Sequence, residues 1–94
     1  MNILELECSS EMLPNLANFV VNWRVLSFHL KLTEAEIAAI DEDNHTVDEK
    51  RIGMLVKWRG RFAFRATYRV LVQALLDCGR VSDAVDMCKA LSSS

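Results

Sequence analysis

The sequence predicts an all-α fold in which six short helices surround one core. Only one Pro and three Gly occur in 94 residues, so few sharp breaks are available. Apolar residues recur at helical spacing along most of the chain, and no stretch sustains the β-branched alternation of a strand. At two places a threonine is followed three residues later by a glutamate, a pattern that begins helices. We therefore expect one small helical domain.

The first helical segment is expected over residues 11–21, with Ser10 as its N-terminal cap. Pro14 lies within the first turn, where a missing N–H costs little. Residues 23–31 then continue with apolar residues at helical spacing. Asn22 can act as a cap or as a joint, and the pattern does not decide between one bent helix and two.

Two capping boxes predict the next two helices. Thr33 pairs with Glu36, and Thr46 pairs with Glu49, so that each threonine and glutamate satisfy one another's backbone N–H groups. Residues 41–45 are polar and are expected to form the loop between the two helices. The residues expected to face the core from this pair of helices are Ile37, Ile40, Ile52, Leu55 and Trp58.

Two glycines predict where the following helices stop. Gly60 is expected to end the helix that begins at Thr46, and a short basic turn follows. The next helix is expected over residues 64–78 and is closed by Gly79, and the last begins near Ser82. The residues expected to face inward from these two helices are Phe64, Thr67, Tyr68, Leu71, Ala74, Leu75, Cys78, Val81, Ala84, Val85, Cys88 and Leu91.

Charge changes sign completely in the middle of the chain. Residues 33–49 carry seven acids and no Lys or Arg, whereas residues 50–69 carry seven bases and no acid. The net charge of -2 gives no overall attraction to nucleic acid or anionic lipid, so any such binding requires a local patch. A domain with an acidic flank and a basic flank is self-complementary, and copies of it can dock head to tail.

Four pieces of the sequence together resemble the death domains of the death-fold superfamily. They are, in order, NWRVLSFHLKLT, EIAAIDEDN, MLVKW and ATYRVLVQALLDCGRVSDAVDM. Their order and spacing agree with the family from about Leu13 to Leu91. The R-x-D-L-L signature of death effector domains is absent, and Trp58 fits a death domain better than a caspase-recruitment or pyrin domain. The resemblance implies a six-helix antiparallel Greek-key bundle of the death-fold type.

The resemblance also implies a function. Death domains are adaptors that join like domains through asymmetric contacts, often in helical oligomers, in apoptotic or inflammatory signalling. Other death domains, or copies of this chain, are the expected partners. The acidic docking surface is expected to comprise Glu34, Glu36, Asp41, Glu42 and Asp43. The basic docking surface is expected to comprise Lys50, Arg51, Lys57, Arg59, Arg61 and Arg65.

The alternative function is that of a helical module that binds an unlike protein or nucleic acid through its basic face. Residues 57–65 interleave aromatic and basic side chains, a composition that suits phosphate contacts and base stacking. Trp58 and Phe64 fall on positions expected to face the core, however, which argues against nucleic acid. Catalysis is not expected, because the sequence offers no nucleophile, base and orienting group that would converge in one place.

No cofactor, metal ion or small-molecule substrate is expected. Asp83, Asp86 and Cys88 share a helix but lack the spacing of a zinc or calcium site. The three cysteines are an odd number without C-x-x-C spacing, which predicts reduced thiols and a cytoplasmic location. No apolar run reaches 18 residues, so no transmembrane helix is expected. The expected organisation is an arm at residues 1–9, a domain at 10–91 and a frayed tail at 92–94.

Overall fold

The computed structural model describes residues 2–93 and contains six α-helices, which confirms the predicted all-α fold. Within these residues no strand joins a sheet, and a single isolated bridge pairs Glu7 with Thr67. Short 3-10 turns flank several of the helices. The helices are α1 Leu13–Leu16, α2 Trp23–His29, α3 Glu34–Asp43, α4 Val47–Phe62, α5 Tyr68–Asp77 and α6 Val81–Ser93.

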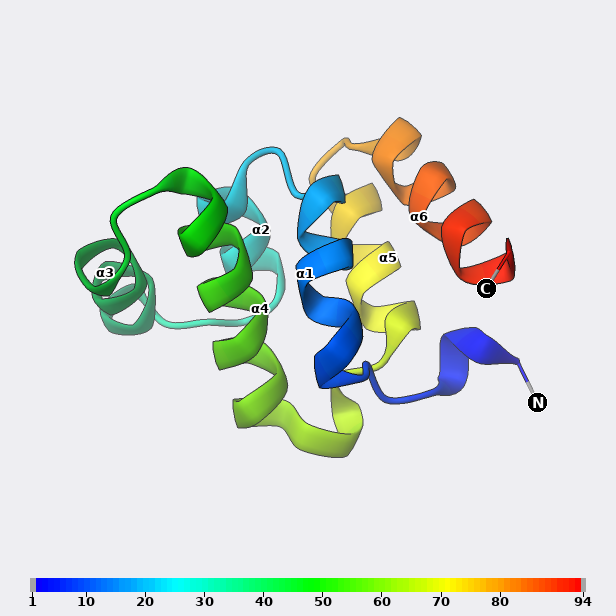
Figure 1. Cartoon of the computed structure of the whole chain (residues 1–94), viewed down its shortest axis with the longest axis horizontal. Helices are drawn as coiled ribbons and strands as arrows, with labels where there is room; N and C mark the ends of the chain where they lie inside the picture. Colours follow the sequence, from blue (N-terminus) through cyan, green and yellow to red (C-terminus); the bar gives the residue numbers. More distant parts are fainter. Residues whose placement is uncertain (1, 94) are drawn as a thin grey trace.

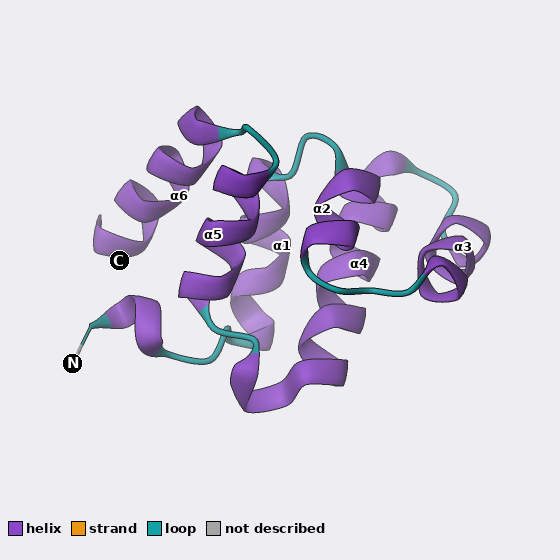
Figure 2. Ribbon diagram, turned by 180° about the vertical axis from the view of Figure 1, so that it is seen from behind, coloured by secondary structure: helices purple, strands orange, loops and turns teal. Residues whose placement is uncertain are grey.

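The helices form a bundle from which α3 projects at one end. α1 and α4 lie in front of α2 and α5 in Figure 1, and Figure 2 shows the reverse order from behind. α4 packs against α1, α2 and α3, while α6 packs against α5 and the 3-10 turn Ala17–Phe19. The two ends of the chain lie at the end of the molecule opposite α3 (Figure 1).

The region before α3 contains two helices, which settles the question left open by the sequence. Helical turns run from Ser10 to Phe19, with α1 between two 3-10 turns. Val20 is extended, and Asn22 then caps α2 by accepting a hydrogen bond from the Val25 N–H at 3.2 Å. The chain therefore changes direction between the two helices, and Asn22 is a cap.

Both predicted capping boxes form. The Glu36 N–H donates to Thr33 Oγ1 at 3.1 Å, and the Thr33 N–H donates to Glu36 Oε1 at 2.8 Å. The box at Thr46 and Glu49 has the same two bonds at 3.1 and 3.0 Å. The predicted loop at residues 41–45 is too long, however, because α3 continues through Asp43. Its end is held by the next residue, since Asn44 Nδ2 donates to the Ile40 carbonyl at 2.8 Å.

The prediction that Gly60 ends its helix is wrong. α4 continues through Phe62, and the chain turns at Ala63, which has φ +50°. Gly79 does close α5, as predicted, with φ +77°. There the Arg80 N–H donates to the Leu75 carbonyl at 2.9 Å, which is the long bond of a Schellman motif.

The prediction that Phe64 faces the core is also wrong. α5 begins at Tyr68, and Thr67 is its N-terminal cap rather than an inward residue. Phe64 therefore lies in the 3-10 turn Ala63–Arg65, and its side chain is 76% exposed. The 3-10 turn does not continue the helical period of α5, so the position of Phe64 in that period does not set the direction of its side chain.

The core is formed by residues from all six helices, and Trp58 lies near its centre at 1% exposed. Ile37, Ile40, Leu55, Leu71 and Leu75 are buried as predicted. In α6 the buried face is rotated from the predicted one. Ala84, Met87 and Leu91 face inward, whereas Val81 and Val85 are exposed. Met87 was not predicted to be part of the core.

The described residues near the two ends of the chain take part in the packing and in α6. Cys8 is completely buried, and its N–H donates to the Ala66 carbonyl at 2.8 Å. α6 includes residues 92 and 93. Residue 1 of the predicted arm and residue 94 of the predicted tail lie outside the described residues.

Candidate protein-interaction surfaces

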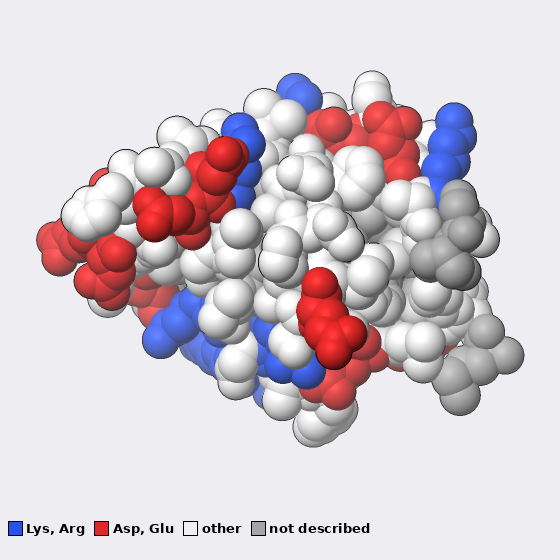
Figure 3. All heavy atoms as spheres, in the orientation of Figure 1, with Lys and Arg blue, Asp and Glu red and all other residues white. Residues whose placement is uncertain are grey.

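The predicted acidic surface lies on α3. This helix packs on α4 through Ile37 and Ile40, which leaves its remaining sides exposed to solvent. Figure 3 shows acidic side chains gathered over the α3 end of the molecule, with basic side chains below them. Glu34, Glu42 and Asp43 are exposed and have no ion pair with any residue in the described part of the chain.

The other two residues of the acidic surface are paired within the molecule. Asp41 binds Lys50 at 2.7 Å and Arg24 at 3.2 Å. The hydrogen bond from Lys50 is the main reason that the pKa of Asp41 is lowered. Glu36 binds Arg61 at 2.5 Å and accepts the capping hydrogen bond from Thr33, which is the main cause of its lowered pKa.

The predicted basic surface lies on α4 and the turn that follows it, and four of its six residues are also paired internally. Lys50 and Arg61 bind the two acids of α3. Arg51 binds Asp48 at 3.1 Å on its own helix. Arg59 Nε donates to the Cys8 carbonyl at 2.5 Å, and its Nη2 lies 3.9 Å from Glu7. Arg59 therefore fastens the N-terminal residues to α4.

The two surfaces are neighbours because α3 packs directly on α4. The ion pairs between them neutralise part of each, which the sequence pattern did not reveal. Lys57 and Arg65 are the residues of the basic surface that have no ion pair within residues 2–93. The charges available to a partner are therefore Glu34, Glu42 and Asp43 on the acidic side, and Lys57 and Arg65 on the basic side.

An exposed aromatic side chain lies beside the available Arg65. Phe64 projects from the turn after α4, while the guanidinium groups of Arg61 and Arg65 lie 5.2 and 6.0 Å from the ring centre of Phe62. The sequence identified the arginines but assigned Phe64 to the core. Aromatic residues and arginine are both enriched at the centres of protein interfaces, so the exposed Phe64 next to Arg65 is a candidate contact.

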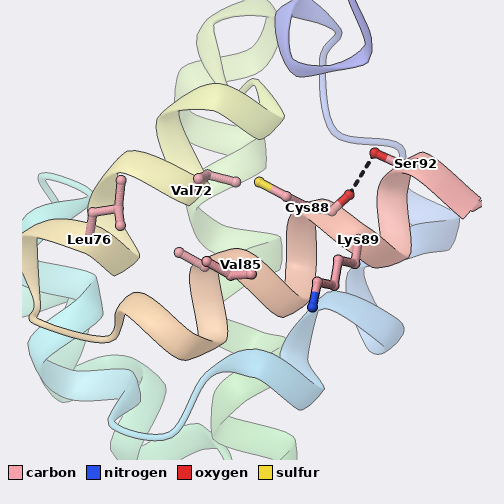
Figure 4. A pocket seen from close by; sticks show the side chains of 7 residues that line it. Val72, Leu76, Val85, Cys88, Lys89 and Ser92 are labelled. Atoms are coloured by element: carbon pink, nitrogen blue, oxygen red, sulfur yellow. Dashed lines mark hydrogen bonds between the residues drawn. The ribbon is translucent and has the colours of Figure 1, made fainter.

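A second apolar feature is the groove of about 630 Å³ between α5 and α6. Figure 4 shows Val72 and Leu76 on one side of it and Val85 and Cys88 on the other. The Ser92 hydroxyl donates to the Cys88 carbonyl at 2.9 Å at the end of the groove. Because the buried face of α6 carries Met87, Val85 lies on the surface and lines this groove.

Within residues 2–93, no group of three or more His, Cys, Asp or Glu side chains is arranged to hold a metal ion. In the same residues, no helix is both long enough and apolar enough to span a membrane.

The family model described as Death domain matches residues 10–92. No solved structure matches the chain.

Proposed function

Because the chain belongs to the death domain family, we propose that it is an adaptor that assembles with other death domains, including copies of itself. Members of this family are protein-interaction modules of death-fold signalling. The setting that we propose is apoptotic or inflammatory signalling in the cytoplasm, where helical oligomers of such domains bring enzymes together. The domain itself acts through binding and carries out no chemical step.

The observation that carries this proposal is the separation of the available charges. Glu42 and Asp43 end α3 beside the start of α4, where Asp41 binds Lys50, whereas Lys57 and Arg65 lie toward the other end of α4, where Arg61 binds Glu36. An unpaired acidic surface and an unpaired basic surface on one molecule favour heterologous contacts, which repeat from copy to copy. Charged contacts of this kind mainly set the encounter rate and the register of docking.

The test is self-association of the purified domain, measured by sedimentation velocity over a range of protein and salt concentrations. The average mass is expected to rise with protein concentration and to fall as salt screens the contacts. Asp43→Lys and Arg65→Glu should each prevent assembly and leave the circular dichroism spectrum unchanged, because both side chains are exposed and unpaired. Asp86→Lys makes the same charge change on α6 and should still assemble.

Mixing the two defective variants provides the sharper result. Each retains one intact surface, so an equal mixture should form a heterodimer and nothing larger. Assembly by both single variants would contradict the docking of these two surfaces. Absence of any assembly by the unmodified domain, alone or with another death domain, would contradict the proposed function.

Exposed Phe64 favours a second candidate, binding of an unlike partner or of nucleic acid through the basic surface. Trp58 is buried and unavailable for stacking, but Phe64 is exposed next to Arg65. Base stacking on an aromatic ring beside arginine is typical of proteins that bind single strands. Fluorescence anisotropy of a labelled oligonucleotide at physiological salt tests this candidate. Binding that is lost in Phe64→Ala would support nucleic acid as the partner, and no binding would exclude nucleic acid.

A further inference from the structure

A hollow of about 220 Å³ lies where the end of α2 meets the last turns of α4 and the first turn of α5. We call its apolar lining, which is Leu30, Trp58, Phe62 and Val70, the floor, and its polar lining, which comes from the end of α2 and the turn after α4, the rim. Figure 2 shows α2 and α5 on the near side of the molecule when it is seen from behind.

The rim of the hollow carries two cations. Lys31 and Arg65 line it beside His29, and none of its lining residues is acidic. Lys31 and Arg65 are exposed, and neither side chain has an ion pair within the described chain. An apolar floor inside a cationic rim suits an apolar side chain that is flanked by carboxylates.

The backbone beside the hollow adopts uncommon conformations at two residues. Lys31 has φ +69° and Ala63 has φ +50°, and these are the residues other than glycine with positive φ in the described chain. Lys31 follows α2 at the position of a Schellman motif where glycine fits best, and the Leu32 N–H donates to the Ser27 carbonyl at 3.0 Å. Stability alone favours glycine there, so the lysine side chain at the rim points to binding.

The occupant that fits this rim is present on the chain itself. Val47 is 53% exposed and is the large exposed apolar residue within the acidic residues 33–49. Asp43 precedes it at the end of α3 and has no ion pair in the described chain. Asp48 follows it with a side chain that is 85% exposed, although one oxygen binds Arg51.

The same molecule cannot place Val47 in its own hollow. Val47 begins α4, whereas Trp58 and Phe62 lie in the last turns of this 16-residue helix, which is about 24 Å long. The contact therefore joins two copies. Because the occupant and the hollow lie at opposite ends of α4, each copy can receive one neighbour and insert into another.

We infer that the corner between α3 and α4 of one copy, with Val47 between Asp43 and Asp48, docks into the hollow of a second copy, where Lys31 and Arg65 meet the carboxylates. This inference rests on the proposed self-assembly and names the residues that make its contact. Lys31 and Val47 lie outside both surfaces that the charge pattern predicts. Substitutions at these two residues therefore test the inference separately from the proposed function.

The test compares three substitutions by sedimentation velocity. Lys31→Gly removes the rim charge and also relieves the positive φ, so the fold is retained. Val47→Ser removes the apolar side chain, and both changes should weaken self-association by about tenfold or more, as expected for central interface residues. Val56→Ser is the matched control, because Val56 is also 53% exposed but lies in the middle of α4. The Val56→Ser variant should self-associate as strongly as the unmodified chain.

Nuclear magnetic resonance then locates the contact. A ¹⁵N-labelled Val47→Ser chain, which keeps its hollow, is mixed with an unlabelled Lys31→Gly chain, which keeps its Val47. The largest shifts are expected at His29, Arg65 and Val70. Self-assembly that survives Lys31→Gly and Val47→Ser would overturn this inference and leave the proposed function standing. If Lys31→Gly lost self-association and Val47→Ser kept it, Val47 would not be the occupant. An unmodified chain that never self-associates would overturn both.

Discussion

At the scale of the residue, Trp58 and Phe64 differ in what surrounds their rings. Trp58 is 1% exposed and Phe64 is 76% exposed. Trp58→Ala should lower the free energy of unfolding by about 3 to 5 kcal/mol, because it removes a large side chain from the core. Phe64→Ala should change it by less than about 0.5 kcal/mol. Urea denaturation measures both. Equal losses would contradict the exposed position of Phe64.

The carboxylates that accept hydrogen bonds from caps or a lysine make stability depend on pH. The Thr33 and Thr46 backbone N–H groups lower the pKa of Glu36 and Glu49 below 4.5, and Lys50 lowers the pKa of Asp41 below 3.8. The folded state therefore binds fewer protons than the unfolded state. The stability from these groups is present at neutral pH and is lost as the pH falls below about 4.5 through the folded pKa values.

The measurement is the melting temperature between about pH 7 and pH 3, where a decrease on acidification is expected. Glu36→Gln keeps a hydrogen-bond acceptor but cannot titrate. This variant should be less stable than the unmodified chain at pH 7 and should lose less stability on acidification. An unchanged pH dependence in Glu36→Gln would show that its carboxylate makes no contribution.

Local patterns explain which residue roles could be predicted. A capping box needs only residues three apart, so both boxes could be read directly from the sequence. The ion pair between Glu36 and Arg61 joins residues far apart in the chain, and only the packing of α3 on α4 brings them together. The charge pattern therefore identified the residues of both candidate surfaces but not which of them are neutralised internally.

At the scale of the element, two glycines next to helix ends have opposite roles. Gly60 lies inside α4, and a Cβ there would meet no atom within 4 Å. Gly60→Ala should raise stability by about 1 kcal/mol, because alanine favours a helix over glycine. Gly79 has φ +77°, so Gly79→Ala should lower stability by about 1 to 2 kcal/mol. Thermal denaturation of the Gly60→Ala and Gly79→Ala variants measures both changes in stability. Destabilisation by Gly60→Ala would mean that α4 ends at Gly60.

The ends and faces of helices depend on packing as well as on composition. A glycine stops one helix and is tolerated in another, so composition could not distinguish Gly60 from Gly79. Two apolar stripes are available on α6, one with Met87 and one with Val85 and Cys88. Contact with α5 and with the 3-10 turn Ala17–Phe19 selects the Met87 stripe as the buried face. The remaining stripe lines the groove of Figure 4.

At the scale of the whole molecule, the six-helix architecture could be predicted because most helices carry both a start signal and a buried stripe. The role of the N-terminal residues could not, because they are short and lack a helical period. Their contacts join segments far apart in the chain. The Tyr68 N–H donates to the Leu6 carbonyl at 3.1 Å, the Cys8 N–H donates to Ala66, and Arg59 donates to the Cys8 carbonyl. The arm thereby connects α4 to α5.

This connection predicts that the domain is incomplete without the arm, even though the family match begins at residue 10. Deleting residues 2–8 removes the three hydrogen bonds just described, the buried Cys8, and the partly buried Ile3 and Leu4. The expected loss is on the order of 3 to 5 kcal/mol, since each hydrogen bond contributes about 1 kcal/mol and apolar burial adds to it. Urea denaturation of the shortened chain measures this loss.

Cys8→Ala is the matched control, because it removes the thiol but keeps all three hydrogen bonds, and it should lose less stability. If the shortened chain were as stable as the full chain, residues 2–8 would be an appendage, and the bundle would be held together by its helices alone.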